Sequence, residues 1–167
     1  MPDKETLERA HEDEREGKSP STQAGEFVKE EMHHIREGKH GAASTKQAIA
    51  IGLSKARRAG VKLQPPRKGS AKVKKQAARD YQKGQSQPGK RPSRTRSRAV
   101  SGVLKREGRS AASHNALFQQ ARSTSRTRGA AARRQSALKA VRTKGSTVRR
   151  QAAKKAARTR SQSHKAA

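Results

Sequence analysis

The sequence predicts a mostly disordered chain with α-helical elements, a single αα-hairpin and no β-sheet. Leu, Ile, Val and Phe together number 18 of 167 residues, well below the ~20% that marks folded chains. The formal net charge is +29 and the mean hydropathy is −1.20. Apolar burial is then too small to offset the conformational entropy lost on folding across the whole chain. Only about residues 23–62 carry a helical pattern of apolar residues that predicts folding.

The distribution of charge divides the chain into segments. Residues 1–38 hold 11 of the 13 acids against 6 bases, whereas residues 39–167 hold 36 bases against Asp80 and Glu107. Such an asymmetry indicates that different segments have different roles. We expect four of them: an acidic arm (1–22), a helical hairpin (23–62), a basic linker containing Pro and Gly (63–98), and a basic tail rich in Ala, Arg, Lys and Ser (99–167).

The acidic arm has the composition of a helix but lacks a face to bury. Residues 3–16 favour helix, yet Leu7 is their only large apolar residue. We therefore expect a solvated, fraying helix or coil.

The hairpin is the segment whose pattern predicts folding. Its helices are expected at about residues 25–37 and 45–59, and Ser44 and Gln47 have the spacing of a capping box between them. Ala24 begins the stripe of the first helix, with Phe27 at the edge of that stripe. The predicted core residues are Val28, Met32, Ile35, Ile49 and Leu53.

The linker and the tail carry weaker helical signals. A short helix is expected across residues 71–81, and weak helical patterns cover residues 99–105 and 111–122. Within the tail, residues 134–143 recur sixteen positions later as residues 150–159. Each copy is a short Ala-rich helix former with cations on every side.

The charge of the tail points to a polyphosphate partner. Residues 91–167 contain 16 Arg, 6 Lys and 1 Glu. Neutralising phosphates releases counterions, which gives affinity without sequence reading. The three aromatic residues (Phe27, Tyr81 and Phe118) provide no stacking platform of the kind that RNA readers use, which favours duplex DNA over RNA.

Candidate nucleic-acid contacts follow from the position of the bases. In the hairpin they are Lys46, Lys55, Arg57 and Arg58. In the linker and tail they are Arg94, Arg96, Arg98, Arg126, Arg128, Arg133, Arg134, Arg142, Lys144, Arg149, Arg150, Lys154, Lys155, Arg158 and Arg160.

The second helix of the hairpin offers two further roles. Ile51 lies roughly opposite Ile49, which indicates packing against a second copy of the hairpin or against the acidic arm. The alternative is a helix-turn-helix-like reader, with Lys46, Gln47, Lys55 and Arg58 facing DNA.

The block Lys46-Gln-Ala-Ile-Ala-Ile-Gly-Leu-Ser-Lys-Ala-Arg57 resembles a family of small basic bacterial proteins, a domain of unknown function sometimes labelled DNA-binding. The resemblance covers about residues 24–62 and implies a bacterial source, with no established site residues to transfer. The tail is similar in composition to the histone-H1-like proteins of bacteria. The likeness of the tail implies a nucleoid-associated protein. The acidic, polar first twenty residues, unlike a secretory signal, predict that the protein stays in the cytoplasm.

Other classes of function have little support in the sequence. There is no Cys and no nucleophile paired with a base, so we expect no enzyme, cofactor or small-molecule substrate. No apolar run approaches the ~18 residues of a membrane span. His33, His34 and His40 lie near Glu30 and Glu31, but adjacent histidines point to different faces of a helix, so we expect solvated side chains and no metal site.

One alternative from another class remains open. In it, the hairpin is an adaptor that binds another protein. The tail then only tethers it to nucleic acid, including ribosomal RNA, or to an acidic partner.

Overall fold

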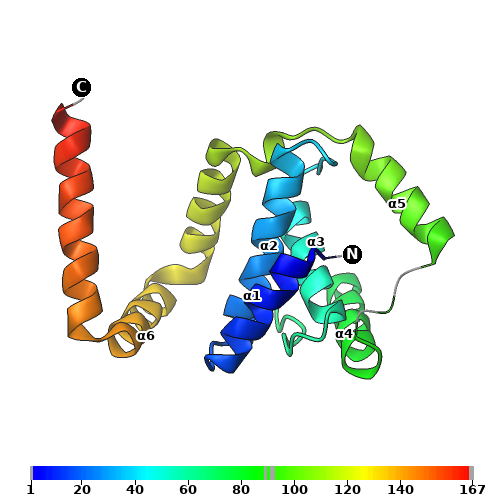
Figure 1. Cartoon of the computed structure of the whole chain (residues 1–167), viewed down its shortest axis with the longest axis horizontal. Helices are drawn as coiled ribbons and strands as arrows, with labels where there is room; N and C mark the ends of the chain where they lie inside the picture. Colours follow the sequence, from blue (N-terminus) through cyan, green and yellow to red (C-terminus); the bar gives the residue numbers. More distant parts are fainter. Residues whose placement is uncertain (1, 89, 91–92, 166–167) are drawn as a thin grey trace. The chain divides into compact units, whose positions relative to one another are not determined.

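The computed structural model describes residues 2–88, 90 and 93–165, and these are predominantly helical (Figure 1). No β-strand occurs among them. The elements are α1 (Lys4–Arg15), α2 (Pro20–Arg36), α3 (Thr45–Arg58), α4 (Ala71–Ser86), α5 (Arg94–Arg106), the short 3₁₀ helix η1 (Ser110–Ala112) and α6 (His114–Lys165).

The prediction of a mostly disordered chain is therefore wrong. The number of large apolar residues underestimates the size of the hydrophobic core, because alanine supplies much of that core. One cluster joins Met32 and Ile35 to four buried alanines, and a second joins Phe27 to three more. Helices that meet through small side chains approach closely, so they need fewer large residues to exclude water. The buried alanines are Ala10, Ala24, Ala42, Ala48, Ala56, Ala111 and Ala112.

Helices α2 and α3 form the predicted hairpin, with α2 beginning five residues earlier than expected. The Ser44 hydroxyl accepts from the Gln47 amide at 3.2 Å, and the Gln47 side chain accepts from the Ala43 amide at 2.7 Å. The helices cross at Gly52, where an added Cβ would lie 2.8 Å from Val28 Cα. Contact this close requires glycine.

The predicted core residues of the hairpin lie in or against its core. Met32 and Ile35 are buried, Val28 and Ile49 pack against the same cluster, and Leu53 packs against the second. Phe27 differs from its prediction. It is fully buried at the centre of the second cluster rather than lying at an edge.

The acidic arm is helix α1, and it is not solvated on all sides. Thr6, Ala10 and Asp13 are buried, and Leu7 packs against the cluster of Phe27. The contact surface of α1 is built from small and polar residues, which an apolar pattern does not reveal. Arg9 extends it by donating to Glu26 of α2 at 2.7 Å.

The stretch predicted as a basic linker is mostly structured, because α4 packs against α3. Ala77 and Asp80 are buried, and the Ser54 hydroxyl donates to the Asp80 carboxylate at 2.8 Å. Gly84 meets the main chain at Arg57 so closely that a Cβ would overlap its carbonyl oxygen.

The end of α5 and η1 close over the loop between α2 and α3. The Gly41 amide donates to the Leu104 carbonyl at 2.8 Å, and the Ala42 amide donates to the Gly108 carbonyl at 3.1 Å. The Thr45 hydroxyl donates to the Ala111 carbonyl at 2.7 Å.

Two compact units make up the chain, residues 1–120 and residues 121–167. Helix α6 continues through the second unit and is interrupted at Gly129 and Gly145 (Figure 1). None of the helices in the described part of the chain has both the length and the apolar character that a membrane span requires.

Candidate nucleic-acid interface

The second unit presents a dense array of cations. Residues 121–167 contain 10 Arg and 5 Lys and no acid. Among the side chains described there none is buried, and only Ser125 and Ala132 are half-buried. The exposed residues include these predicted contacts: Arg126, Arg128, Arg133, Arg134, Arg142, Arg149, Arg150, Lys154, Lys155 and Arg158. The side chains of Lys144 and Arg160, also predicted contacts, lie outside those that the structure describes.

The interruptions of α6 coincide with its sequence repeat. Gly129 has φ 73° and ψ 167°, and Gly145 has φ 64° and ψ 175°. A residue with a Cβ atom does not adopt these backbone angles, so glycine is required at both positions. The two glycines are separated by the same sixteen positions as the repeated residues 134–143 and 150–159. Each copy of the repeat therefore lies in a helical segment that follows one of these glycines. We call each such segment a rod and the glycine before it a joint.

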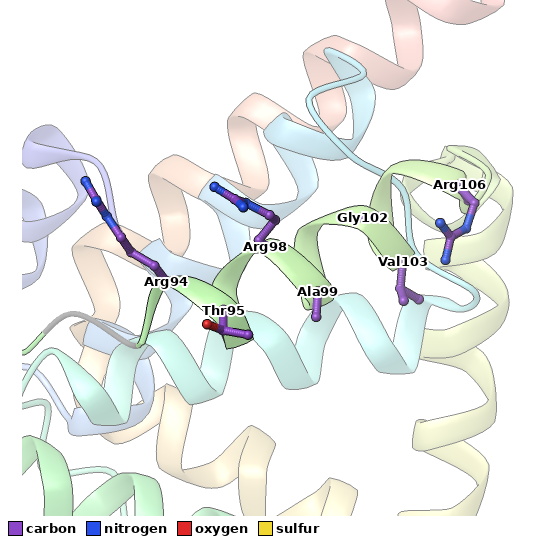
Figure 2. A pocket seen from close by; sticks show the side chains of 7 residues that line it. All are labelled: Arg94, Thr95, Arg98, Ala99, Gly102, Val103 and Arg106. Carbon is purple, nitrogen blue, oxygen red and sulfur yellow. The ribbon is translucent and has the colours of Figure 1, made fainter.

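Helix α5 carries a second group of exposed cations. Arg94, Arg96 and Arg98 are all exposed, and the Ser93 hydroxyl caps the helix by accepting from the Arg96 amide at 3.4 Å. In Figure 2, Arg94 and Arg98 project from the same side of the helix. An open depression follows the helix, lined by Arg94, Thr95, Arg98, Ala99, Gly102, Val103 and Arg106. Its lining contains three guanidinium groups and no acid.

The hairpin contributes less than the sequence predicted. Lys46 is exposed and Arg58 is half-buried. Lys55 instead turns toward α2, where its Nζ lies 2.7 Å from Glu31 Oε2 and 3.1 Å from Glu30 Oε1. Arg57 is only 7% exposed and donates from Nε to the Leu63 carbonyl at 3.1 Å.

These contacts correct two of the predicted site residues. Burial removes the Arg57 guanidinium from solvent and lowers its pKa, an effect that the nearby Asp80 only partly opposes. Burial also disfavours the charged form of Lys55, but the Glu31 and Glu30 carboxylates outweigh it and raise the Lys55 pKa. We therefore leave both residues out of the candidate interface. Without Lys55, the helix-turn-helix-like face loses one of its four predicted contacts, while Ile51 on the same helix is half-buried.

The prediction of solvated side chains around Glu30, Glu31 and His34 is wrong, because these residues form a buried polar cluster beside the hairpin. Glu30 and Glu31 are 4% and 0% exposed, and His34 is 9% exposed. His34 Nε2 lies 3.0 Å from Asp3 Oδ2, and this hydrogen bond lowers the Asp3 pKa more than burial raises it. The signal available in the sequence was Glu31 and His34 at i, i+3 spacing, followed by His40 in the loop. The cluster consists of Asp3, Glu30, Glu31, His34, His40 and Lys55.

The hairpin is also the part of the chain that resembles other proteins. Residues 19–68 match a family of unknown function (DUF6496). No curated protein and no solved structure gives a significant match. The matched residues include α2, α3 and most of the buried polar cluster, and they end before α4. Residues 19–68 thus resemble an uncharacterised domain family.

Proposed function

We propose that this protein binds duplex DNA without reading its sequence, in the manner of a nucleoid-associated, histone-like protein. The observation that carries the proposal is the second unit, where 15 bases and no acid occur in 47 residues, with the described side chains largely exposed. Duplex DNA carries one negative charge per ~1.7 Å, so it is a matching surface for such a segment.

The acids of the first unit are poor alternative partners for these cations, because many already have one. Glu26 lies 2.7 Å from Arg9, and Asp13 lies 2.7 Å from Lys18. Glu30 and Glu31 are buried against Lys55. A separate polyanion is therefore a better partner for the positive charge of the tail than the protein's own carboxylates are.

The preponderance of arginine supports phosphate as the group that is bound. Arginine contacts phosphate through two parallel N–H donors, whereas lysine acts as a point charge. Aromatic stacking has little part in this proposal. Phe27 is buried, and the Tyr81 hydroxyl accepts from Gln64 at 3.0 Å. Phe118 is exposed, but a single ring is no platform for successive bases. Duplex DNA fits these features better than single-stranded RNA does.

The proposed geometry of DNA binding comes from the rods of α6. A rod of about 15 helical residues is ~22 Å long, and its cations surround the helix axis. Glycine joints allow successive rods to change direction as they follow a curved backbone. In this proposal the exposed arginines of α5 add contacts to those of α6.

The test is fluorescence anisotropy of the full chain on two unrelated duplexes and one RNA of equal length. With about eight phosphate contacts, the logarithm of the binding constant should fall with the logarithm of salt at a slope near −7. The two duplexes should bind equally, and RNA should bind less tightly. A preference of more than about tenfold for one duplex would show direct readout of bases instead.

A second candidate, an adaptor that acts through the hairpin, is favoured by one observation. The family match covers residues 19–68 and includes none of the tail. Failure of the full chain to bind DNA at about 0.15 M salt would favour this candidate, because the tail's affinity would then be too weak to act at physiological ionic strength.

A further inference from the structure

The buried polar cluster contains a carboxylate that lacks hydrogen-bond donors. Glu31 is 0% exposed, and neither of its oxygens has a hydrogen-bond partner. Lys55 Nζ lies 2.7 Å from Oε2, and His40 Nε2 lies 3.2 Å from Oε1. Both are at ion-pair distance, but neither has the angle of a hydrogen bond. Buried carboxylate oxygens rarely lack donors without a reason.

Glu30, the preceding residue, is different. Its Oε2 accepts from the Asp3 amide at 3.1 Å, and its Oε1 accepts from Lys55 Nζ at 3.1 Å. The requirement for a further positive group is thus concentrated at Glu31, and in particular at Oε1, which faces an imidazole.

The two imidazoles have outer partners that fix their orientation. His40 Nδ1 lies 3.0 Å from the Gly41 carbonyl oxygen, which can only accept, so this nitrogen carries the proton. In the neutral ring, the lone pair of Nε2 then faces Glu31 Oε1, and the two repel unless a proton or a cation lies between them. His34 has the same arrangement, with Nε2 at 3.0 Å from Asp3 Oδ2. Metal-binding histidines characteristically have such carboxylate or carbonyl partners on the other nitrogen.

The charges of the cluster require a further positive group. Glu30 and Glu31 are buried and contribute two negative charges against one positive charge on Lys55, whereas Asp3 is exposed, so one buried negative charge is left uncompensated when both imidazoles are neutral. Burial makes such an uncompensated charge unfavourable, and a cation held by the cluster would offset it.

We propose that Glu31, His34 and His40 bind a zinc ion. One ligand atom from each lies within 4.8 Å of the others, and a contraction of at most about 1.5 Å gives the ~3.3 Å separation of tetrahedral zinc ligands. Imidazole nitrogen with carboxylate oxygen suits Zn²⁺ better than Mg²⁺ or Ca²⁺, which prefer oxygen alone. Water takes the fourth position. The ion joins α2 to the loop that leads into α3.

The test is titration of the full chain with Co²⁺, whose visible absorption reports tetrahedral coordination. We expect one equivalent to bind and to be displaced by Zn²⁺. His40→Gln and Glu31→Gln should weaken binding by at least about tenfold, an effect that even outer partners of a metal reach. The matched control is His33→Gln, which alters the exposed neighbour of His34.

Thermal unfolding provides a second readout. Zn²⁺ should raise the Tm of the wild type and of His33→Gln, relative to chelator, and should not raise that of Glu31→Gln. This comparison also decides the question if His40→Gln fails to fold. Absence of tetrahedral Co²⁺ absorption would overturn the proposal. Binding that survives both Glu31→Gln and His40→Gln would overturn it as well.

Discussion

The two compact units use the same cationic side chains in opposite ways. All 13 acids lie in residues 1–120, where Lys55 and Arg9 pair with carboxylates on another helix. Residues 121–167 have no acid, and cations such as Lys154 are exposed. A base is a candidate contact for DNA only where the fold supplies no acid for it. The net charge of the sequence does not make that distinction.

Removal of residues 121–167 is the most severe test of the claim that the two units use their cations differently. We expect the affinity for duplex DNA to fall by at least about 10³-fold at low salt, because most phosphate contacts are lost. Anisotropy with the full chain as reference measures the change. The Tm of the remaining 120 residues should stay the same, since the two units are compact separately. Retention of most of the affinity would place the binding surface in the first unit.

The same substitution in each unit separates the two uses of lysine. Lys55→Gln leaves two buried carboxylates without their ammonium partner, so we expect the free energy of unfolding to fall by about 2–4 kcal/mol. This range lies toward the low end for buried pairs because the Lys55 side chain is 22% exposed. Lys154→Gln should change stability by less than about 0.5 kcal/mol. Urea denaturation measures both effects.

DNA binding should show the reverse order. Lys154→Gln should reduce the salt slope by about one, as expected for loss of one phosphate contact, and Lys55→Gln should leave the slope unchanged. Equal effects of the two substitutions on stability would contradict the distinction between the units.

The hairpin could be predicted because its signals are local. The apolar spacing of α2 and the cap formed by Ser44 and Gln47 both depend on neighbours within a few residues. The folding of the rest could not be predicted in this way. Helices α1 and α4 pack through alanine, glycine and paired polar residues, whose role depends on which helix lies opposite. A pattern of large apolar residues does not contain that information.

Close packing of the hairpin is tested by two glycines in neighbouring helices. Gly52→Ala places a Cβ 2.8 Å from Val28 Cα, so we expect a loss of about 1–3 kcal/mol from overpacking. Gly25→Ala meets nothing within 4 Å and should stabilise the protein by up to about 1 kcal/mol through helix propensity. Thermal unfolding measures both variants. Stabilisation by both would show that α2 and α3 do not cross at Gly52.

The smallest expected effect concerns the glycine joints of the second unit. Alanine does not adopt the backbone angles of Gly129 and Gly145, so Gly129→Ala with Gly145→Ala should join the rods into one helix, with about 1 kcal/mol of local gain at each site. Far-UV circular dichroism should show added helix, while the Tm of the first unit stays constant. A few-fold loss of DNA affinity should accompany the change. Unchanged affinity would show that the joints have no part in binding.

The exposure of the candidate contacts agrees with the sequence prediction more fully in residues 121–167 than in the hairpin. The cations of residues 121–167 have no acid near them in sequence or in their own unit, so composition was sufficient to predict their exposure. Lys55 and Arg57 were misassigned because their partners, Glu31 and the Leu63 carbonyl, come from other parts of the fold. The side chains of the polar cluster were predicted to be solvated for the same reason, since His40 meets Glu31 only after the loop turns back.

The most direct test of the central claim removes four exposed cations from each unit and compares the salt slopes. In α6 the substitutions are Arg149, Arg150, Lys154 and Lys155 to Gln. In the first unit they are Lys18, Lys29, Lys39 and Lys62 to Gln, each of which is exposed and pairs with a carboxylate. Both variants lose four positive charges. The α6 variant should reduce the slope by up to about four, whereas the first-unit variant should change it little. Equal reductions would contradict the account, because total charge and not the second unit would then determine DNA binding.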